Sequence, residues 1–435
     1  MDRRQFLENP YRPGAGHFPP LLAGRIVEQN HFKRALRERH PSENFLITGL
    51  RGFGKTVLLD RLRDMAEDHG WIWVGNDLSE SASLSEERLA LRVLTDLSEA
   101  ISSKLGSKAQ CDGEASSREP APLSADDFGR EQHVFDALKG VYENSPGLPS
   151  DRLKAVISRA GSLAARARAS GLILSYDEAQ CLRDHADRNE FPMSMLVETV
   201  QSLQRRPGVV PVLLLLSGLP HVQDALTDTR TYTERMFHIL TLDRLSREET
   251  WAALATPLDN LMPPLHASKE LIDKVVDLSG GYPYLIQFFG KELVDKLLEN
   301  GGTLQYDAFP AADTLERLDA GLFGARWSRT TDKQREILGL LANRGANAAR
   351  EITASEVAEL SEGETSNAQA TQHLQALCER GLLYRTRYGR YAFTVPMSEA
   401  MILRRLRTEQ EVEDSWQLAA IKDDKAKSKR WSWFR

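Results

Sequence analysis

The sequence predicts an α/β fold: a parallel five-stranded sheet with helices on both faces, followed by a helical lid and a winged-helix domain. Three observations support this prediction. Five short apolar runs alternate with helical stretches, a glycine-rich loop follows the first run, and beyond residue 243 the pattern changes to amphipathic helices that end in a hairpin. Alternation of this kind is typical of strands buried on both faces of a parallel sheet.

The five runs are rich in β-branched and aromatic residues, as buried strands are. They are NFLITG (44–49), WIWVGND (71–77), LILSYD (172–177), PVLLLLSG (211–218) and FHILTL (237–242). Between the second and third runs, Ser, Ala, Gly, Pro and acidic residues accumulate, so we expect a flexible insertion over about 106–150.

The stretch GLRGFGKT follows the first run and matches the phosphate-loop pattern G-x-x-x-x-G-K-[ST]. Because backbone N–H groups and a helix N-terminus would face a triphosphate there, we expect nucleotide binding by the whole loop. Lys55 would neutralise phosphate oxygens and Thr56 would bind Mg²⁺. The predicted nucleotide-binding residues are Gly49, Leu50, Arg51, Gly52, Phe53, Gly54, Lys55, Thr56 and Val57.

Two adjacent acids, Asp177 and Glu178, end the third run. Two like charges at a strand tip repel each other unless each has a separate task. Beside a magnesium-bound triphosphate, Asp177 would hold the metal and its water shell, and Glu178 would polarise the attacking water. The sequence therefore predicts an ATPase that uses ATP and Mg²⁺.

These motifs resemble those of the AAA+ ATPases, in the branch that includes origin-recognition proteins and many bacterial ATP-binding proteins. The resemblance covers roughly residues 9–400, and its marks include GLRGFGKT, YDEAQ, LLLLSGLP and TERMFHILTLDRLS. It implies that the segment NPYRPGAGHFPPLLAGR, which ends in Gly24 and Arg25, lines the adenine pocket and that Ser217 senses the γ-phosphate. It also implies that Arg235, with Arg230 as the alternative, reaches the nucleotide of a neighbouring subunit, so we expect a homo-oligomer.

The lid departs from the common AAA+ pattern. Where many members carry an arginine, SGGYPYLIQ offers Tyr282 and Pro283, a Gly-x-Pro form that resembles the lid of signal-transducing STAND ATPases, in which the proline packs near the base. The alternative is that these residues only punctuate helices. Without the arginine, we expect the lid to report the nucleotide by packing rather than by a charge contact, with Tyr282 and Pro283 as its nucleotide-binding residues.

The last third predicts three helices and a hairpin around Tyr388 and Gly389, the order of a winged helix. In DNA-binding versions the third helix reads the groove and the wing touches the backbone. The candidate DNA-binding residues are Asn367, Gln369, Arg385, Arg387 and Arg390. The candidate recognition helix has almost no positive charge, so a protein-binding or autoinhibitory role stays open.

Composition sets the remaining expectations. The 435 residues are 41% hydrophobic with net charge −6, no run suits a membrane span, and three scattered cysteines indicate a reducing compartment, so we expect a cytoplasmic protein. The predicted divisions are an N-terminal adenine-pocket segment (1–24), the ATPase core (25–242), a helical lid (243–325), a winged helix (326–405) and a basic-aromatic tail (406–435).

Three hypotheses follow for function. The first is an ATP-driven switch associated with double-stranded DNA, similar to replication initiators and transposition regulators. The second is a STAND-like signalling or defence switch whose winged helix binds a protein partner. A nucleotide-binding adaptor without turnover is disfavoured because Lys55, Asp177 and Glu178 are all present.

Overall fold

A computed structural model describes most of the chain. The described residues are 8–14, 16–38, 41, 43–111, 125–206, 210–229, 235–262, 264–304, 306–344, 351–387, 389–395 and 398–408. The chain divides into two compact units, the first made of residues 1–264 and 281–291 and the second of residues 265–280 and 292–435. The finer division into core, lid and winged helix stays a prediction.

The first unit is built on a parallel sheet of five strands, as the sequence predicted. The strands are β1 (Asn44–Thr48), β2 (Ile72–Val74), β3 (Leu172–Tyr176), β4 (Val212–Gly218) and β5 (Phe237–Thr241). Their order in space is β2-β3-β4-β1-β5, so β1 lies between β4 and β5. Each of the five apolar runs therefore contains one strand.

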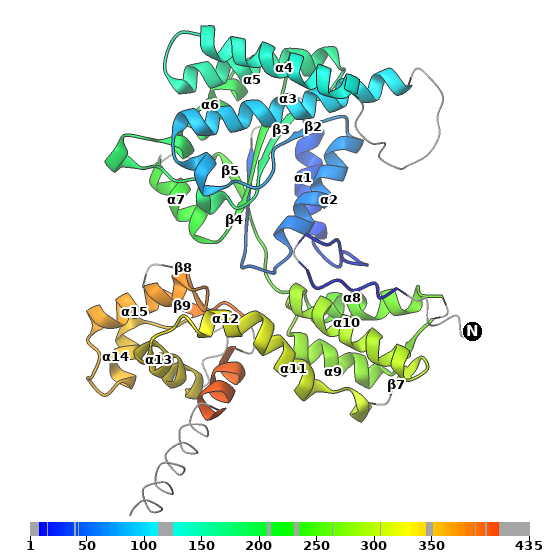
Figure 1. Cartoon of the computed structure of the whole chain (residues 1–435), viewed down its shortest axis with the longest axis vertical. Coiled ribbons are helices and arrows are strands. Elements are labelled where there is room, and N and C mark those ends of the chain that lie inside the picture. The colour runs from blue at the N-terminus through cyan, green and yellow to red at the C-terminus, as the bar shows by residue number, and fades with distance from the viewer. Residues whose placement is uncertain are drawn as a thin grey trace, which may run out of the picture. The chain divides into compact units, whose positions relative to one another are not determined.

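Helices cover both faces of this sheet (Figure 1): α1 and α2 lie on one side, and α3, α4, α5 and α6 are layered on the other. Their bounds are α1 (Ile26–Leu36), α2 (Lys55–Asp68), α3 (Glu86–Cys111), α4 (Ala125–Asn144), α5 (Pro149–Arg166) and α6 (Pro192–Gln204). The unit also contains α7 (His221–Thr229), α8 (Arg247–Asp259) and the short turns η2 (Glu80–Ser83), η3 (Ala179–Cys181) and η4 (Ala186–Arg188).

The strands alternate their side chains between two apolar layers, as the two-residue period of a strand requires. Leu46, Leu174 and Leu214 join the core under α3, α5 and α6. On the other face, the ring of Phe45 meets Phe32 of α1 edge to face at 5.5 Å. Burial on both faces explains why the runs are apolar throughout.

The expected flexible insertion over 106–150 is wrong for most of the part that the structure describes. Residues 106–111 continue α3, residues 125–144 form α4, and α5 begins at Pro149. The physical reason is an apolar stripe that the composition concealed: Leu138 is fully buried, and Val134, Phe135 and Val141 pack against the same core. Residues 112–124 lie outside the described residues.

The second unit is mainly helical. Helix α10 (Pro283–Glu299) begins in the first unit and ends in the second, where α9 (Lys269–Ser279) and the short parallel pair β6 (His266–Ala267) and β7 (Thr303–Leu304) also lie. The further elements are η6 (Tyr306–Ala308), α11 (Ala311–Leu318), η7 (Asp319–Phe323) and α12 (Gly324–Trp327).

Three helices and an antiparallel hairpin then follow in the predicted order. They are α13 (Asp332–Asn343), α14 (Ala354–Leu360), α15 (Asn367–Glu379), β8 (Leu383–Arg387) and β9 (Arg390–Phe393). Thr331 and Ser366 cap α13 and α15 with reciprocal side-chain bonds, which fixes where these helices begin. Residues 398–408 are helical, and the predicted tail beyond residue 408 lies outside the described residues.

Across the described part of the chain, no helix has the length and apolar character needed to cross a membrane.

Candidate functional site

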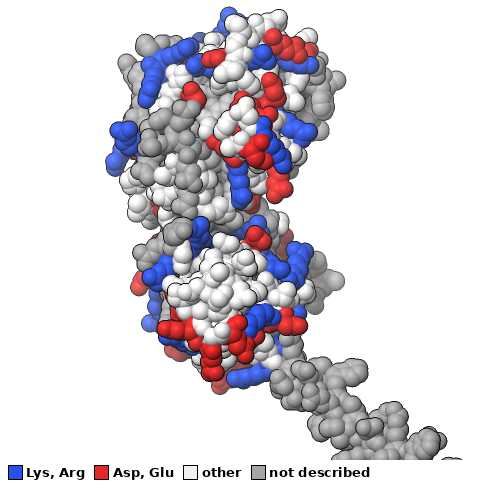
Figure 2. Space-filling model, turned by 90° about the vertical axis from the view of Figure 1, so that its left-hand side faces the viewer, with Lys and Arg blue, Asp and Glu red and all other residues white. Residues whose placement is uncertain are grey.

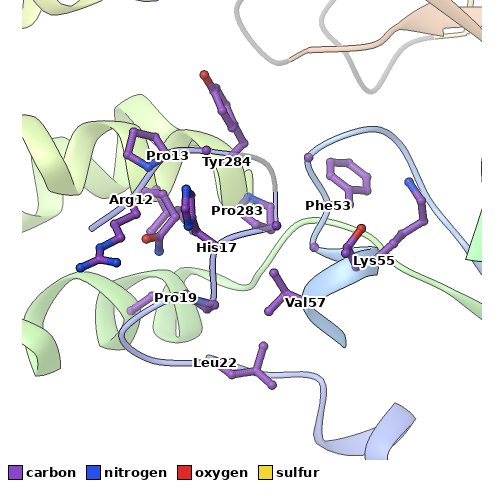
Figure 3. A pocket seen from close by; sticks show the side chains of 18 of the residues that line it. Arg12, Pro13, His17, Pro19, Leu22, Phe53, Lys55, Val57, Pro283 and Tyr284 are labelled. Carbon is purple, nitrogen blue, oxygen red and sulfur yellow. The ribbon is translucent and has the colours of Figure 1, made fainter. Parts of the chain in front are cut away.

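A cavity of about 330 Å³ lies in the first unit, between the phosphate loop, the segment ahead of α1 and the start of α10. Figure 3 shows Lys55 at one side of this cavity and Arg12 and Pro13 at the opposite side, with Val57 and Pro283 between them. The lining residues of the described chain fall into three sequence segments: 12–25, 51–57 and 283–287, joined by Asp177, Glu178, Leu245 and Ala253. The cavity therefore has a phosphate-loop end and an opposite end.

The phosphate loop joins β1 to α2, as predicted. Gly52 and Gly54 have φ of 84° and 83°, in the left-handed region that favours glycine. This conformation curls the loop in front of the α2 N-terminus. The Lys55 ammonium donates to the carbonyl oxygens of Gly49 at 2.9 Å and Leu50 at 3.1 Å. Burial lowers the pKa of Lys55, and the charge of Asp177 opposes that effect.

Thr56 and Asp177 meet across the loop. The Thr56 hydroxyl donates to Asp177 Oδ2 at 2.7 Å, and the Asp177 residue is 6% exposed. Hydroxyl and carboxylate oxygens are hard ligands of the kind Mg²⁺ prefers. The described residues hold no cluster of three or more His, Cys, Asp or Glu side chains that would bind a metal alone. Thr56 and Asp177 thus fit a magnesium ion that takes its other ligands from phosphate oxygens and water.

Glu178 lies beside Asp177 but has a different environment. Its side chain is exposed, lines the cavity and accepts a hydrogen bond from the Gln180 amide. Gln180 in turn accepts from the Leu219 N–H at 3.2 Å, which ties Glu178 to the end of β4. The Glu178 backbone is left-handed, with φ 53° and ψ 36°. The two acids are therefore separated: one is held against Thr56, and the other faces the cavity.

Ser217 lies on β4 opposite Ile47 of β1, beneath the phosphate loop. Its residue is fully buried, and its hydroxyl has no hydrogen-bond partner among the described residues. Ser217 does not line the cavity. The predicted γ-phosphate contact is thus not made directly from the cavity wall in this structure.

Arg25 lines the cavity, as the resemblance implied, but its guanidinium is committed to the protein. It donates to the carbonyl oxygens of Phe53 at 3.3 Å and of Asp243, and it lies 3.7 Å from a Glu28 carboxylate oxygen. Burial lowers the pKa of Arg25. The structure therefore gives Arg25 the role of fastening the phosphate loop to the chain that follows β5.

Gly24 also has left-handed backbone, with φ 68°, and a side chain there would collide with the Glu249 carboxylate. It does not line the cavity.

The resemblance assigned the segment ahead of α1 to the adenine pocket, but sequence reasoning did not name the residues that line the end opposite the phosphate loop, apart from Arg25 and Pro283. Residues 12–23 supply Arg12, Pro13, Gly14, Gly16, His17, Pro19, Leu21, Leu22 and Ala23, and α10 supplies Tyr284, Ile286 and Gln287. The available signal in the sequence was the number of prolines and leucines in NPYRPGAGHFPPLLAGR, which indicates an apolar surface ahead of α1. Tyr11 anchors this segment: it is 1% exposed, and its hydroxyl donates to Leu254 O at 2.7 Å.

Tyr282 and Pro283 have separate roles. Pro283 lines the cavity, whereas Tyr282 is buried against the phosphate loop: its hydroxyl donates to Arg51 O, and its ring meets Phe53 edge to face at 5.0 Å. The Tyr284 N–H donates to Gly52 O at 3.2 Å. The start of α10 therefore contacts the loop backbone, and Tyr282 does not line the cavity.

The remaining predicted residues lie apart from this cavity. Arg235 is exposed just before β5, and Arg230 lies outside the described residues. On α15, Asn367 is exposed, while Gln369 accepts from the Ser366 backbone N–H at 3.0 Å in the helix cap. On the hairpin, Arg385 and Arg390 are exposed, and the Arg387 side chain is outside what the structure describes.

A phosphate loop between the first strand of a parallel sheet and its following helix, with an acid pair on a neighbouring strand, defines a P-loop nucleoside triphosphatase fold. Comparison with solved structures shows that an origin-recognition protein has the same fold. The chain is similar to the ORC2 protein of Aeropyrum pernix in its ADPNP–ADP complexes, with 15% identity, a TM-score of 0.53, and coverage of 92% of this chain and 98% of that chain.

Two further likenesses are weaker. The Aeropyrum pernix ORC1 protein in complex with DNA has 16% identity and a TM-score of 0.43 over 91% of this chain and 97% of that chain. A Thermotoga maritima RuvB has 13% identity and a TM-score of 0.41 over 88% and 96%. Residues 320–402 match a family model described as a domain of unknown function, DUF8462. No curated protein matches the chain in sequence.

Proposed function

We propose that this protein is an AAA+ switch that binds and hydrolyses ATP with Mg²⁺. The observation that carries the proposal is the contact between Thr56 and Asp177 at 2.7 Å, at the mouth of a cavity that Lys55 and Glu178 also line. A phosphate loop and an acid pair have no need to converge on one cavity unless a magnesium-bound triphosphate lies between them.

Each residue then has a distinct task. Backbone N–H groups of residues 51–56 and the α2 N-terminus attract phosphate, and Lys55 exchanges its two carbonyl contacts for phosphate oxygens. Thr56 and Asp177 would hold magnesium, which supplies charge neutralisation at the phosphates. Glu178, exposed to the cavity and held by Gln180, orients and deprotonates the attacking water.

Replacement of Glu178 by glutamine tests this assignment. We expect Glu178→Gln to bind Mg-ATP with wild-type affinity and to lower kcat by about 10²-fold or more, because the amide keeps the shape but loses the base. Lys55→Ala should instead weaken nucleotide binding, and Glu38→Gln, at an exposed glutamate of the same unit, should change neither quantity. Unchanged turnover in Glu178→Gln would remove Glu178 from this role.

For the second unit, we propose that α13, α14, α15, β8 and β9 form a winged helix that contacts double-stranded DNA. The support is the order of elements together with exposed Arg385 and Arg390 on the hairpin. Figure 2 shows that acidic and basic side chains are interspersed on the face it displays, so affinity would depend on a local patch.

The DNA role can be measured through its salt dependence. A double variant, Arg385→Ala with Arg390→Ala, should lower affinity for duplex DNA at every sequence and reduce the slope of log affinity against log salt by about 1 to 2. Arg404→Ala is the matched control, because that arginine pairs with Glu316 at 3.2 Å. Equal affinity and slope in the double variant would contradict the wing assignment.

One observation favours a second function, a STAND-like switch with a protein partner. Helix α15 carries no lysine or arginine. The Gln369 side chain accepts a hydrogen bond within the N-terminal cap of this helix, so its oxygen is not available to a DNA base. If duplex DNA changes neither ATPase rate nor assembly at low salt, this second function becomes the better one.

The proposal also includes assembly into a homo-oligomer in which Arg235 reaches the nucleotide of a neighbouring subunit. Its support is an exposed, permanently charged guanidinium just before β5. Mixing Arg235→Ala with Lys55→Ala should restore ATPase activity at their shared interfaces. Absence of rescue at all concentrations would argue against a contact in trans, and Arg230 would be tested in the same way.

A further inference from the structure

The end of the cavity opposite the phosphate loop has flat apolar walls. Figure 3 shows Pro13, His17, Pro19 and Leu22 on the segment ahead of α1, facing Pro283 of α10 and Val57 of α2. Rings and branched side chains of this kind suit a planar aromatic base, which gains from being enclosed between apolar surfaces. A polar group among these walls would therefore decide which base binds.

Gln287 is such a polar group. It lines the same cavity one turn along α10 from Pro283, and its Oε1 atom is enclosed with no hydrogen-bond partner among the described residues. On the next turn of the same helix face, Gly290 packs directly on Tyr11, since a Cβ at Gly290 would be 2.6 Å from Tyr11 Cδ1. This close contact fixes the distance between α10 and the segment that forms the opposite wall.

An enclosed carbonyl oxygen without a donor destabilises the nucleotide-free protein, and a ligand that supplies a donor removes that cost on binding. The terminal torsion of a glutamine side chain is soft, so the oxygen can turn toward such a donor at little cost.

We propose that Gln287 determines base specificity by accepting a hydrogen bond from the exocyclic amine at C6 of adenine. This inference rests on the proposed nucleotide site and adds its choice of base. Purine lacks this amine, and hypoxanthine and guanine carry an acceptor oxygen at C6 with their donor at the neighbouring N1, so none of these bases offers Gln287 a donor at the C6 position. Adenine supplies the missing donor, and binding of adenine nucleotides is favoured for that reason.

The test uses diphosphates, so that hydrolysis does not enter the measurement. Calorimetric titration of the whole chain with ADP, IDP and purine riboside diphosphate, which lacks the C6 amine, should show ADP binding about 5- to 100-fold more tightly than either analogue. In Gln287→Met, which keeps the side-chain length but has no amide, ADP affinity should fall to that of the analogues, and analogue affinities should be unchanged. Gln287→Glu keeps an acceptor oxygen and should keep the preference for ADP.

Gln223→Met is the matched control, because Gln223 is exposed on α7 of the same unit. The proposal is overturned if Gln287→Met binds ADP as wild type does, or if it loses the same factor for all three ligands. If the nucleotide site itself is wrong, the result differs: no diphosphate would bind to the wild-type chain, and Lys55→Ala would show the same absence of binding as the wild type. That outcome would overturn both proposals together.

Discussion

Gly52 and Gly54 provide a matched pair that tests how the phosphate loop is held. Their φ values are nearly equal, 84° and 83°, but their surroundings differ. A Cβ at Gly54 would meet nothing within 4 Å, whereas a Cβ at Gly52 would lie 2.9 Å from Tyr282 Cε1 and 3.1 Å from Tyr284 Cβ. Alanine at position 54 therefore adds backbone strain alone, and alanine at position 52 adds strain and a collision.

The magnitudes follow from these contacts. Left-handed backbone costs a non-glycine residue about 1–2 kcal/mol. At Gly52, moving the Tyr282 ring out of its contacts with Phe53 and Arg51 adds about 1–3 kcal/mol, the usual cost of overpacking a buried site. For a domain of this size, that difference corresponds to a melting temperature roughly 2–10 °C lower for Gly52→Ala than for Gly54→Ala.

Scanning calorimetry of the nucleotide-free chain, with the first unit's transition followed, measures this difference. A Tyr282→Ala background should reduce the extra cost at Gly52, because the colliding ring is gone. Equal melting of the two glycine variants, or an unchanged difference in the Tyr282→Ala background, would refute the contact between α10 and the loop as described.

Two other predictions concern buried polar groups. Ser217→Ala should leave the melting temperature unchanged or raise it, because the hydroxyl it removes is buried and unpaired among the described residues. The same variant should lower ATP turnover if Ser217 senses the γ-phosphate. Wild-type turnover would exclude that role. Burial raises the pKa of Glu399, whose Oε1 is enclosed without a described partner, so the folded state binds its proton more tightly than the unfolded chain does. Ionisation of Glu399 therefore opposes folding as pH rises through its folded pKa, and Glu399→Gln should melt at a higher temperature than wild type at pH 7 but at the same temperature below about pH 4. A stabilisation by Glu399→Gln that does not depend on pH would contradict this explanation.

The sequence predicted the sheet well because its strands are short, fully buried and separated by clear helical stretches. Asn44–Thr48 and Leu172–Tyr176 each fall within a predicted run. The phosphate loop and the acid pair were likewise readable, since both are contiguous motifs whose chemistry depends on neighbouring residues in the chain.

The far end of the cavity could not be predicted in the same way. The resemblance pointed to the segment that contains Pro13, His17 and Leu22 but not to these residues, and it did not point to Gln287. Two long-range contacts bring this segment against α10: the packing of Tyr11 against Gly290, and the hydrogen bond that the Asn9 side-chain amide donates to Lys291 O at 2.9 Å. The composition around residues 125–144 also misled, because the apolar residues of α4 are interrupted in the sequence by polar residues such as Asp136 and Glu143, which are exposed.

The Tyr282 side chain was expected at the nucleotide, and the structure places it one layer behind, on the loop backbone. Sequence alone could indicate that the lid lacks an arginine, but it could not distinguish contact with the ligand from contact with the loop that holds the ligand.

The left-handed backbone at Glu178 has a consequence for how this protein can change. Its φ of 53° destabilises the fold by about 1 kcal/mol relative to glycine at the same position. Glutamate therefore occupies a position where glycine would make the folded protein more stable. In a library selected only for stability, glycine and asparagine should accumulate at position 178 while Asp177 stays unchanged. Substitutions at position 178 that stabilise the fold therefore also remove ATP turnover. Without selection for hydrolysis, we expect the sequence to change toward a form that binds the nucleotide without cleaving it.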